Sequence, residues 1–172
     1  MMSTATMRAL GAPDDGRDDA ALADPSASLG RRPVVLLVED DDADADLARE
    51  ALAGSALATE LHVVVDGAAA LAFLRRDGPH ADAPVPDLVL LDLNMPGIDG
   101  RSVLMEVKRD PVLRDIPVVV LSSSASPRDV AGAYALSANC YVTKPVGLAS
   151  YLATIRAIVR FWLGVATPPR TR

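Results

Sequence analysis

The chain has 172 residues, of which 50% are hydrophobic and only 3% aromatic, and it carries a formal net charge of −6. This length supports one domain with a sizeable core, which must be built from aliphatic side chains because aromatic ones are scarce. The acidic balance argues against non-specific binding to nucleic acid or to an anionic membrane, and it leaves room for a bound cation.

The two ends of the chain differ in composition from its middle. Residues 1–32 are rich in Ala, Asp, Gly, Pro and Ser and show no sustained apolar period, which is typical of a disordered arm. Residues 164–172 are expected to form a loose tail. The folded domain is therefore predicted to span residues 33–163.

Within this domain, short apolar runs alternate five times with helical patterns. The predicted strands are 33–38, 59–65, 87–92, 116–122 and 140–143. The predicted helices are 43–55, 67–77, 100–110, 126–138 and 146–163. Because the first, third and fourth strands are apolar throughout, they are expected to be covered on both faces. The order predicts an α/β fold with a parallel sheet, right-handed crossovers and helices on both sides.

Polar side chains follow four of the predicted strands at the point where each strand ends. They are Glu39, Asp40, Asp92, Asn94, Ser122 and Lys144. Ligands of open α/β sheets bind beyond the carboxyl ends of the strands, so these groups are expected to meet in one crevice.

Crowded carboxylates repel one another, and a divalent cation removes that cost. A carboxylate can also act as a nucleophile toward phosphorus, and phosphoryl transfer requires neutralised charge on the equatorial oxygens. We therefore expect Asp92 to accept a phosphoryl group and Glu39 and Asp40 to hold Mg²⁺. Ser122 and Lys144 are expected to bind the phosphoryl oxygens.

Each of these residues also has a simpler interpretation. The acidic run "EDDDADAD" can serve only to cap a helix N-terminus, where anions are favoured. Asp92 can be the first residue of an Asx turn. Ser122 and Lys144 can be ordinary surface groups. The combined pattern favours a site, because the polar groups recur at equivalent positions of the predicted sheet.

Four segments together resemble the receiver domain of two-component response regulators. They are "VVLLVEDD", "PDLVLLDLNMPGIDG", "IPVVVLSSS" and "CYVTKPV", and the resemblance covers residues 33–163. It implies a flavodoxin-like (CheY-like) doubly wound five-stranded parallel sheet in the order 2-1-3-4-5, with five helices.

The resemblance also implies roles for the site residues. Asp92 would take a phosphoryl group from a phosphohistidine on a sensor kinase. Asp40, Asp92 and the backbone carbonyl of Asn94 would contact Mg²⁺, with Glu39 acting directly or through water. Such a protein is a self-catalysing phosphoacceptor rather than an enzyme with an outside substrate.

Three further expectations come from the same resemblance. Ser122 stands where the family has Thr or Ser, and it would move toward the phosphoryl group. Tyr141 matches the aromatic switch position, whose ring turns inward after phosphorylation. The bond between Lys144 and Pro145 is usually cis in the family.

Other segments resemble a narrower group, the small single-domain regulators that serve bacterial phytochrome kinases. These segments are "DGPHADAPVPD", "VKRDPVLRDIPVVVLSSS" and "IRAIVRFWL". Only nine residues follow Leu163, so no DNA-binding or enzymatic output domain is expected. The expected output is binding: to a sensor histidine kinase such as a phytochrome, to a downstream phosphotransfer protein, or to a second copy.

Two other function classes remain as alternatives. The first is a hydrolase that forms an aspartyl phosphate, although that class usually sets its nucleophile after the first strand, with a second Asp two residues on. Here the candidate follows the third strand, and Asn94 is the residue two positions on. The second is an acidic scaffold that binds partners without phosphorylation.

The last predicted helix carries a wide apolar stripe, which either packs on the sheet or forms an interface. Phe161 and Trp162 are adjacent, so they point to different sides of the helix. At least one of them is hard to bury in a monomer, and an exposed apolar patch marks an interface. We therefore expect a homodimer. Its predicted interface residues are Tyr151, Ile155, Ile158, Phe161 and Trp162.

The chain shows no sign of a membrane or secreted protein. Arg156 and Arg160 interrupt the C-terminal apolar run, so no segment approaches the ~20 apolar residues of a membrane helix. The N-terminus lacks a signal-peptide pattern. The one cysteine, Cys140, excludes an intrachain disulfide and is compatible with a reducing compartment. A cytoplasmic location is expected.

Overall fold

The computed structural model describes residues 30–167 and 169 and contains a parallel five-stranded sheet in the order β2-β1-β3-β4-β5. The strands are β1 (Val34–Val38), β2 (Glu60–Val64), β3 (Leu88–Asp92), β4 (Val118–Ser122) and β5 (Cys140–Thr143). The predicted fold class and strand order are confirmed. The predicted arm, apart from residues 30–32, and residues 168 and 170–172 of the predicted tail lie outside the described residues. Residues 164 and 165, predicted as loose, belong to a helical turn.

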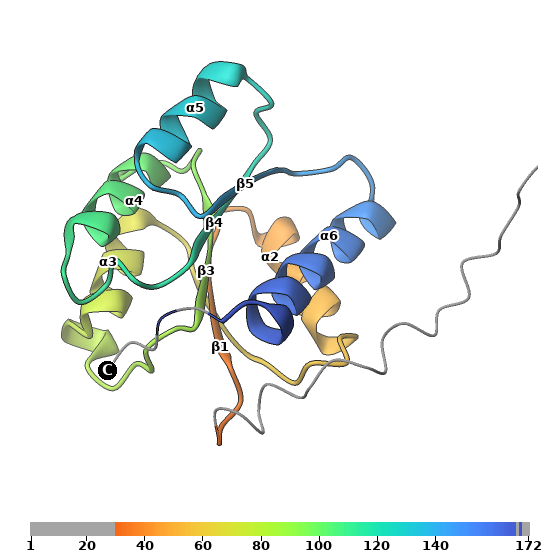
Figure 1. Cartoon of the computed structure of the whole chain (residues 1–172), viewed down its shortest axis with the longest axis horizontal. Helices are drawn as coiled ribbons and strands as arrows, with labels where there is room; N and C mark the ends of the chain where they lie inside the picture. The colour runs from red at the N-terminus through yellow and green to blue at the C-terminus, as the bar shows by residue number, and fades with distance from the viewer. Residues whose placement is uncertain (1–29, 168, 170–172) are drawn as a thin grey trace, which may run out of the picture.

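Four α-helices connect the strands and a fifth follows β5, and each begins within two residues of its predicted start. They are α2 (Asp42–Ala53), α3 (Gly67–Arg75), α4 (Gly100–Arg109), α5 (Pro127–Ala135) and α6 (Leu148–Arg160). A short 3-10 helix, η2 (Gly78–His80), precedes β3, and a π-helical turn, η3 (Phe161–Val165), continues α6. Helices α2 and α6 lie on one side of the sheet, and α3 and α4 lie on the other (Figure 1).

The two faces of the sheet are buried in separate hydrophobic clusters. Within β1, Leu36 belongs to the cluster under α3 and α4, while the next residue, Leu37, belongs to the cluster under α2 and α6. Successive side chains of a strand point to opposite faces, so a strand covered on both sides must be apolar at every position. This explains the continuous apolar runs of β1, β3 and β4.

The helices that follow β1, β2 and β3 each begin at an aspartate cap. The Asp41 carboxylate accepts hydrogen bonds from the backbone N–H groups of Ala43 and Asp44. Asp66 and Asp99 cap α3 and α4 in the same way. Such caps satisfy backbone donors that the first helical turn leaves free. The caps therefore fix the start of each of these three helices in the connection that follows the carboxyl end of a strand, and the polar site forms at that edge of the sheet.

The C-terminal helix is more apolar than the sequence prediction allowed. The segment Leu148–Val165 has a mean hydropathy of 1.3 and is long and apolar enough, by length and composition only, to cross a membrane. One such helix is weak evidence for a membrane span. Here 28% of the segment is buried, and its buried side chains, Tyr151, Ile155 and Val159 among them, pack against the sheet on one face of an amphipathic helix.

Candidate functional site

Three polar side chains are buried at the carboxyl edge of the sheet. They are Glu39, Asp92 and Ser122, with relative exposures of 1%, 6% and 0%, and they are the buried polar or charged residues of the described chain. Each stands at or directly after the end of a central strand, β1, β3 or β4. Burial of a charged group is costly unless it is paired, so Glu39 and Asp92 require a cationic partner.

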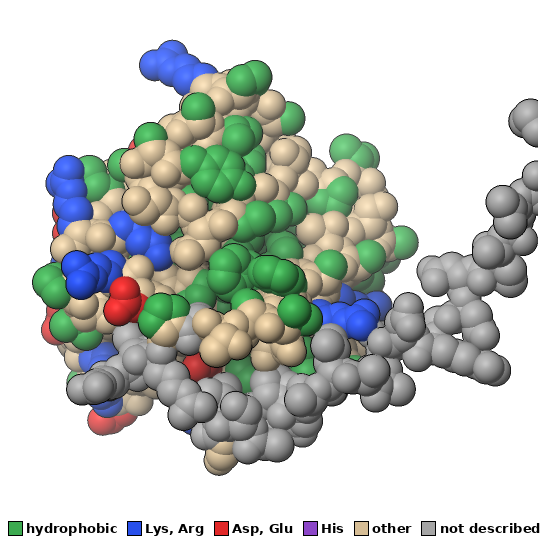
Figure 2. Space-filling model, viewed as in Figure 1, with side chains coloured by type: hydrophobic (Ala, Val, Ile, Leu, Met, Phe, Trp, Pro, Cys, Tyr) green, Lys and Arg blue, Asp and Glu red, His purple; other side chains and the backbone are tan. Residues whose placement is uncertain are grey.

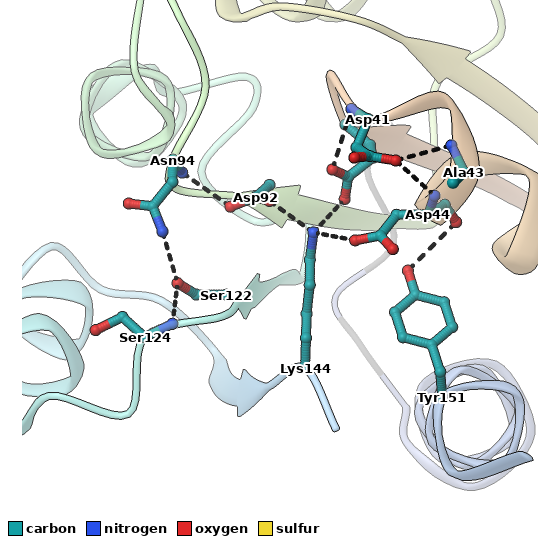
Figure 3. A network of polar contacts seen from close by, with 10 residues as sticks. Asp41, Ala43, Asp44, Asp92, Asn94, Ser122, Ser124, Lys144 and Tyr151 are labelled. Carbon is teal, nitrogen blue, oxygen red and sulfur yellow. Dashed lines mark hydrogen bonds and ion pairs between the residues drawn. The ribbon is translucent and has the colours of Figure 1, made fainter. Parts of the chain in front are cut away.

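Lys144 is that partner. Its Nζ donates to Asp92 Oδ2 at 2.6 Å, to Glu39 Oε2 at 2.7 Å and to Asp44 Oδ2 at 2.8 Å. Figure 3 shows the lysine extended from the end of β5 toward Asp92 and Asp44. The structure thus brings Lys144 and Asp92 together, as the sequence analysis expected. The contribution of Asp44 was not predicted.

The electrostatics of this cluster follow from burial and charge pairing. Burial raises the pKa of Glu39 to about 7, although the hydrogen bond and charge of Lys144 act in the opposite direction. Burial alone would lower the pKa of Lys144, but the hydrogen bonds to Asp44, Asp92 and Glu39 outweigh it and raise that pKa. The lysine is therefore a fixed cation, whereas Glu39 can gain a proton near neutral pH.

Three carboxylates at this edge also fit a divalent cation. Glu39, Asp40 and Asp92 each offer an oxygen, and these oxygens all lie within 4.8 Å of one another. Oxygen donors of this kind suit Mg²⁺, which binds through one or two carboxylates and keeps several water ligands. Asp40 is exposed, so the group is open to solvent on one side. Three of the four predicted metal residues are therefore placed together and match the chemistry of the ion.

The simpler interpretations of the acidic residues also hold in part. Asp41, in the acidic run, caps α2, and Asp92 Oδ1 accepts a hydrogen bond from the backbone N–H of Asn94 at 2.8 Å. The second contact fixes the rotation of the Asp92 carboxyl group. It leaves Oδ2 directed at Lys144. Asp92 thus has the geometry of an Asx turn and also belongs to the buried cluster.

Ser122 is held by two donors. Its Oγ accepts from Asn94 Nδ2 and from the backbone N–H of Ser124, both at 3.2 Å (Figure 3). A hydroxyl oxygen offers two lone pairs and one proton. Because both bonds use the oxygen as acceptor, the Ser122 proton remains free to be donated to another group.

Tyr141 lies beside the same loop. Its hydroxyl donates to the backbone carbonyl of Ser124 at 2.7 Å, and its ring packs against the cluster under α3 and α4. The backbone N–H of Tyr141 in turn donates to the hydroxyl of Tyr134 on α5 at 3.2 Å. The aromatic residue predicted as a switch is therefore bonded to the segment that follows Ser122.

Two expectations are wrong. The described residues contain no cis peptide bond, so the bond between Lys144 and Pro145 is trans, the form that prolyl bonds favour by about 0.5–1 kcal/mol. Of the predicted interface residues, Tyr151, Ile155 and Ile158 are buried under the sheet, because the stripe of α6 faces the core.

The remaining two interface residues lie at the end of α6. Phe161 is 51% exposed, and Trp162 is partly buried against the cluster under α2 and α6. Their rings contact each other edge to face, with centroids 5.3 Å apart. The two adjacent rings therefore lie on different sides of the helix, as predicted: Trp162 packs partly against the core, and Phe161 is largely exposed to solvent.

Comparison with known proteins identifies the architecture. The family model described as "Response regulator receiver domain" matches residues 35–156 of the chain. The chain belongs to the receiver domain family. This receiver domain is 46% identical, over 136 residues, to the response regulator Rcp1 of Synechocystis sp., and the match covers 79% of the chain and 92% of Rcp1.

Solved structures of related receiver domains agree. The phosphorylated cyanobacterial phytochrome response regulator RcpA is 47% identical, with a TM-score of 0.78, and the match covers 81% of this receiver domain and 99% of RcpA. The Mn²⁺-bound form of Rcp1 is 46% identical, with a TM-score of 0.76 and coverage of 80% and 99%. The protein is thus a receiver-domain response regulator of two-component signalling, related to phytochrome response regulators.

Proposed function

We propose that the protein is a single-domain response regulator, its receiver domain spanning residues 33–163, in which Asp92 accepts a phosphoryl group from a histidine kinase. The observation that carries the proposal is the contact between Lys144 Nζ and Asp92 Oδ2 at 2.6 Å, inside a cluster that also contains Glu39. A carboxylate held beside a fixed cation at the edge of the sheet can carry a phosphoryl group whose charge the lysine balances.

Mg²⁺ is the metal proposed for this site. Glu39, Asp40 and Asp92 would hold it, together with the backbone carbonyl of Asn94. When bound, the ion neutralises charge on the phosphoryl oxygens. The Mn²⁺-bound form of the related Rcp1 supports the proposal of a divalent metal. Lys144 donates hydrogen bonds to Glu39 and Asp92, which are also proposed metal ligands. The lysine and the metal ion would therefore bind the same two carboxylates.

Ser122 and Tyr141 are proposed as the elements that report phosphorylation. The free proton of the Ser122 hydroxyl can be donated to a phosphoryl oxygen on Asp92, which would draw the loop after β4 toward the site. Tyr141 is bonded to that loop through the Ser124 carbonyl, so its ring would follow the movement. A local change of charge would then reach the surface between α5 and β5.

The proposed kinase partner is a phytochrome sensor histidine kinase, because the relatives include Rcp1 and the cyanobacterial phytochrome response regulator RcpA. A downstream phosphotransfer protein is the other proposed partner. The net charge of −6 gives no basis for nucleic acid or membrane binding. We place the protein in the cytoplasm, where such a kinase presents its phosphohistidine.

We further propose a homodimer formed by the α5, β5 and α6 face. Figure 2 shows hydrophobic side chains gathered over this part of the molecule. The exposed large hydrophobic residues of these elements and their connections are Tyr134, Val146, Leu148, Phe161 and Val165. Contiguous exposed apolar surface of this kind is typical of protein interfaces. The face replaces the interface predicted from the buried stripe of α6.

The function is tested by incubating the full-length protein with acetyl phosphate and MgCl₂ and then measuring its intact mass. The expected result is one added phosphoryl group that requires Mg²⁺ and is absent in Asp92→Asn. Rapid release of phosphate without an adduct would indicate the aspartyl-phosphate hydrolase instead. No adduct and no release would indicate a scaffold that acts without phosphorylation.

A further inference from the structure

The backbone and side chain of Ser124 join four other groups. Its N–H donates to Ser122 Oγ, and its carbonyl accepts from the Tyr141 hydroxyl. Its own hydroxyl donates to Asp129 Oδ2 at 2.6 Å and accepts from the backbone N–H of Ser126 at 3.2 Å. One residue thus links the hydroxyl beside Asp92 to the aromatic ring proposed as the switch.

The hydrogen bond to Asp129 is anchored from a second helix. Asp129 lies in the first turn of α5, and its other oxygen, Oδ1, accepts from the guanidinium of Arg101, on the first turn of α4, at 2.7 Å. All three side chains in this relay are half-buried. The hydrogen bond from Ser124 lowers the pKa of Asp129 most, and the positive charge of Arg101 lowers it further. The carboxylate is therefore charged at neutral pH.

We propose that Asp129 and Arg101 are positioning residues that act through Ser124 to align both the Ser122 hydroxyl and the Tyr141 ring. The proposal rests on the proposed function of Asp92. Ser124 lies in a segment with no regular secondary structure, between β4 and α5, so side-chain contacts must fix its backbone. The only side-chain acceptor of its hydroxyl in the described structure is Asp129.

The expected consequence is a change in the rate at which Asp92 is phosphorylated, which we call the loading rate. With Asp129 intact, the Ser124 N–H holds the Ser122 oxygen so that its proton can reach a phosphoryl oxygen. Without the carboxylate, Ser124 can rotate and its backbone is freed, and both Ser122 and Tyr141 lose a fixed partner. An ion pair at the surface adds little to stability by itself, so the effect is expected on loading rather than on unfolding.

The first measurement is the loading rate with acetyl phosphate and MgCl₂, followed by intact mass. Asp129→Ala is expected to lower the rate about fivefold, the factor that corresponds to one ordinary hydrogen bond. Asp129→Asn keeps an acceptor for Ser124 and is expected to recover most of the rate. Adding Ser124→Ala to Asp129→Ala should lower the rate no further, since the two residues act as one unit.

A matched control is available on the same helix. Glu106 of α4 pairs with Arg75 of α3 at 2.9 Å, in a comparably exposed ion pair between neighbouring helices. Glu106→Gln is expected to leave the loading rate unchanged. An equal loss of the loading rate in Glu106→Gln and Asp129→Ala would overturn the proposal. The rate would then depend on any ion pair between helices and not on the contact between Asp129 and Ser124.

A second readout does not depend on phosphorylation. The chain has three tyrosines, so protein labelled with 3-fluorotyrosine gives three ¹⁹F resonances, and Tyr141→Phe assigns that of Tyr141. Asp129→Ala should move the Tyr141 resonance and leave that of the buried Tyr151 in place. If the Tyr141 resonance has the same chemical shift in Asp129→Ala as in the wild type, the inference is wrong, even if Asp92 is phosphorylated normally in the wild type.

The two readouts separate the inference from the proposed function. If the wild-type protein takes no phosphoryl group at Asp92, the proposed function fails and the Tyr141 resonance alone decides on the relay. If the wild type is loaded but Asp129→Ala is loaded at the same rate, the proposed function stands and the positioning role of Asp129 and Arg101 is wrong.

Discussion

Lys144 Nζ lies 2.6 Å from Asp92 Oδ2, although the two residues are 52 positions apart in the sequence. The contact exists because β5 and β3 flank β4 in the sheet, so the carboxyl ends of all three strands reach one edge. Lys144 also binds Glu39 and Asp44. One cation therefore balances three carboxylates: that of Glu39 directly after β1, that of Asp44 in α2 and that of Asp92 at the end of β3.

Replacement of this lysine is expected to destabilise the protein and to strengthen metal binding. In Lys144→Met, three carboxylates lose their cation, and removing one partner of a buried pair costs about 3–5 kcal/mol. The free energy of unfolding in EDTA, measured by urea denaturation, should fall by that order. Calorimetric titration should show tighter Mg²⁺ binding than in the wild type, since no lysine competes for the acids. Equal or weaker Mg²⁺ affinity would contradict this account.

The raised pKa of Glu39 predicts a pH-dependent stability in the absence of metal. Its pKa is about 7 in the folded protein and 4.5 without the fold, so the folded state binds more protons between these values. The free energy of unfolding must then fall as pH rises from about 4.5 to about 7, with a total loss of about 3 kcal/mol. Denaturation in EDTA at several pH values measures this slope.

The pH experiment has a direct control. Glu39→Gln removes the titrating group and should flatten the slope in this window. The pKa values of Asp99 and Asp129 are lowered, so their contributions are lost only at more acidic pH, below the range used. Mg²⁺ binds the ionised carboxylates, so its affinity should rise as pH passes 7. A wild-type slope of the opposite sign would show that Glu39 is not buried as a protonatable acid.

The fold was predictable because its physical signals are local. Strands buried on both faces must be continuously apolar, and the run before Glu39 and the run from Leu88 to Leu91 satisfy this condition. Aspartate caps and Pro127 mark the helix starts. The strand order came from the family resemblance, and the parallel register then places the predicted site residues at one edge.

Prediction of the site was weaker where one residue type serves two purposes. Asp44 follows Asp40 within a run of acids, and nothing in the run distinguishes the acid that turns toward Lys144 from those that face solvent. The position of Asp44 in the first turn of α2 decides this, and only the packing of α2 reveals it. The hydrogen bonds that link Ser124, Asp129 and Arg101 join three separate segments of the chain, so no local sequence pattern predicts them.

The interface prediction failed for a related reason. A helix that packs on a sheet and a helix that packs on a partner both show apolar residues three and four positions apart. Ile155 is fully buried under the sheet, so that part of the stripe is core. Only the adjacency of Phe161 and Trp162 carried separate information, since two neighbouring helical residues cannot share one face.

Gly100 is expected to tolerate no side chain, because the first residue of α4 lies against the backbone of Asp92 and Leu93. A Cβ at this position would collide with the backbone carbonyl of Asp92 and lie 2.7 Å from the Leu93 Cα. Gly100→Ala should therefore lower the free energy of unfolding by about 1–3 kcal/mol, as overpacking does. Because the displaced atoms belong to Asp92, loading with acetyl phosphate should also slow.

Gly132 provides the matched comparison for that substitution. It lies inside α5, and a Cβ there would meet nothing within 4 Å. Gly132→Ala should raise the free energy of unfolding by about 0.5–1 kcal/mol, because alanine is the better helix former. Loading of Asp92 should not change. If both variants lost stability equally, the close approach at Gly100 would not be the cause.

Phe161 tests the proposed homodimer. Its ring is 51% exposed, so a polar substitution changes the surface and leaves the core intact. Phe161→Glu should convert the dimer to a monomer, since a charge buried at an interface without a partner is costly. Sedimentation or light scattering at micromolar concentration measures the mass. Val112→Glu, on a connection before β4 and 68% exposed, should leave the dimer unchanged. A monomeric wild type would refute the dimer.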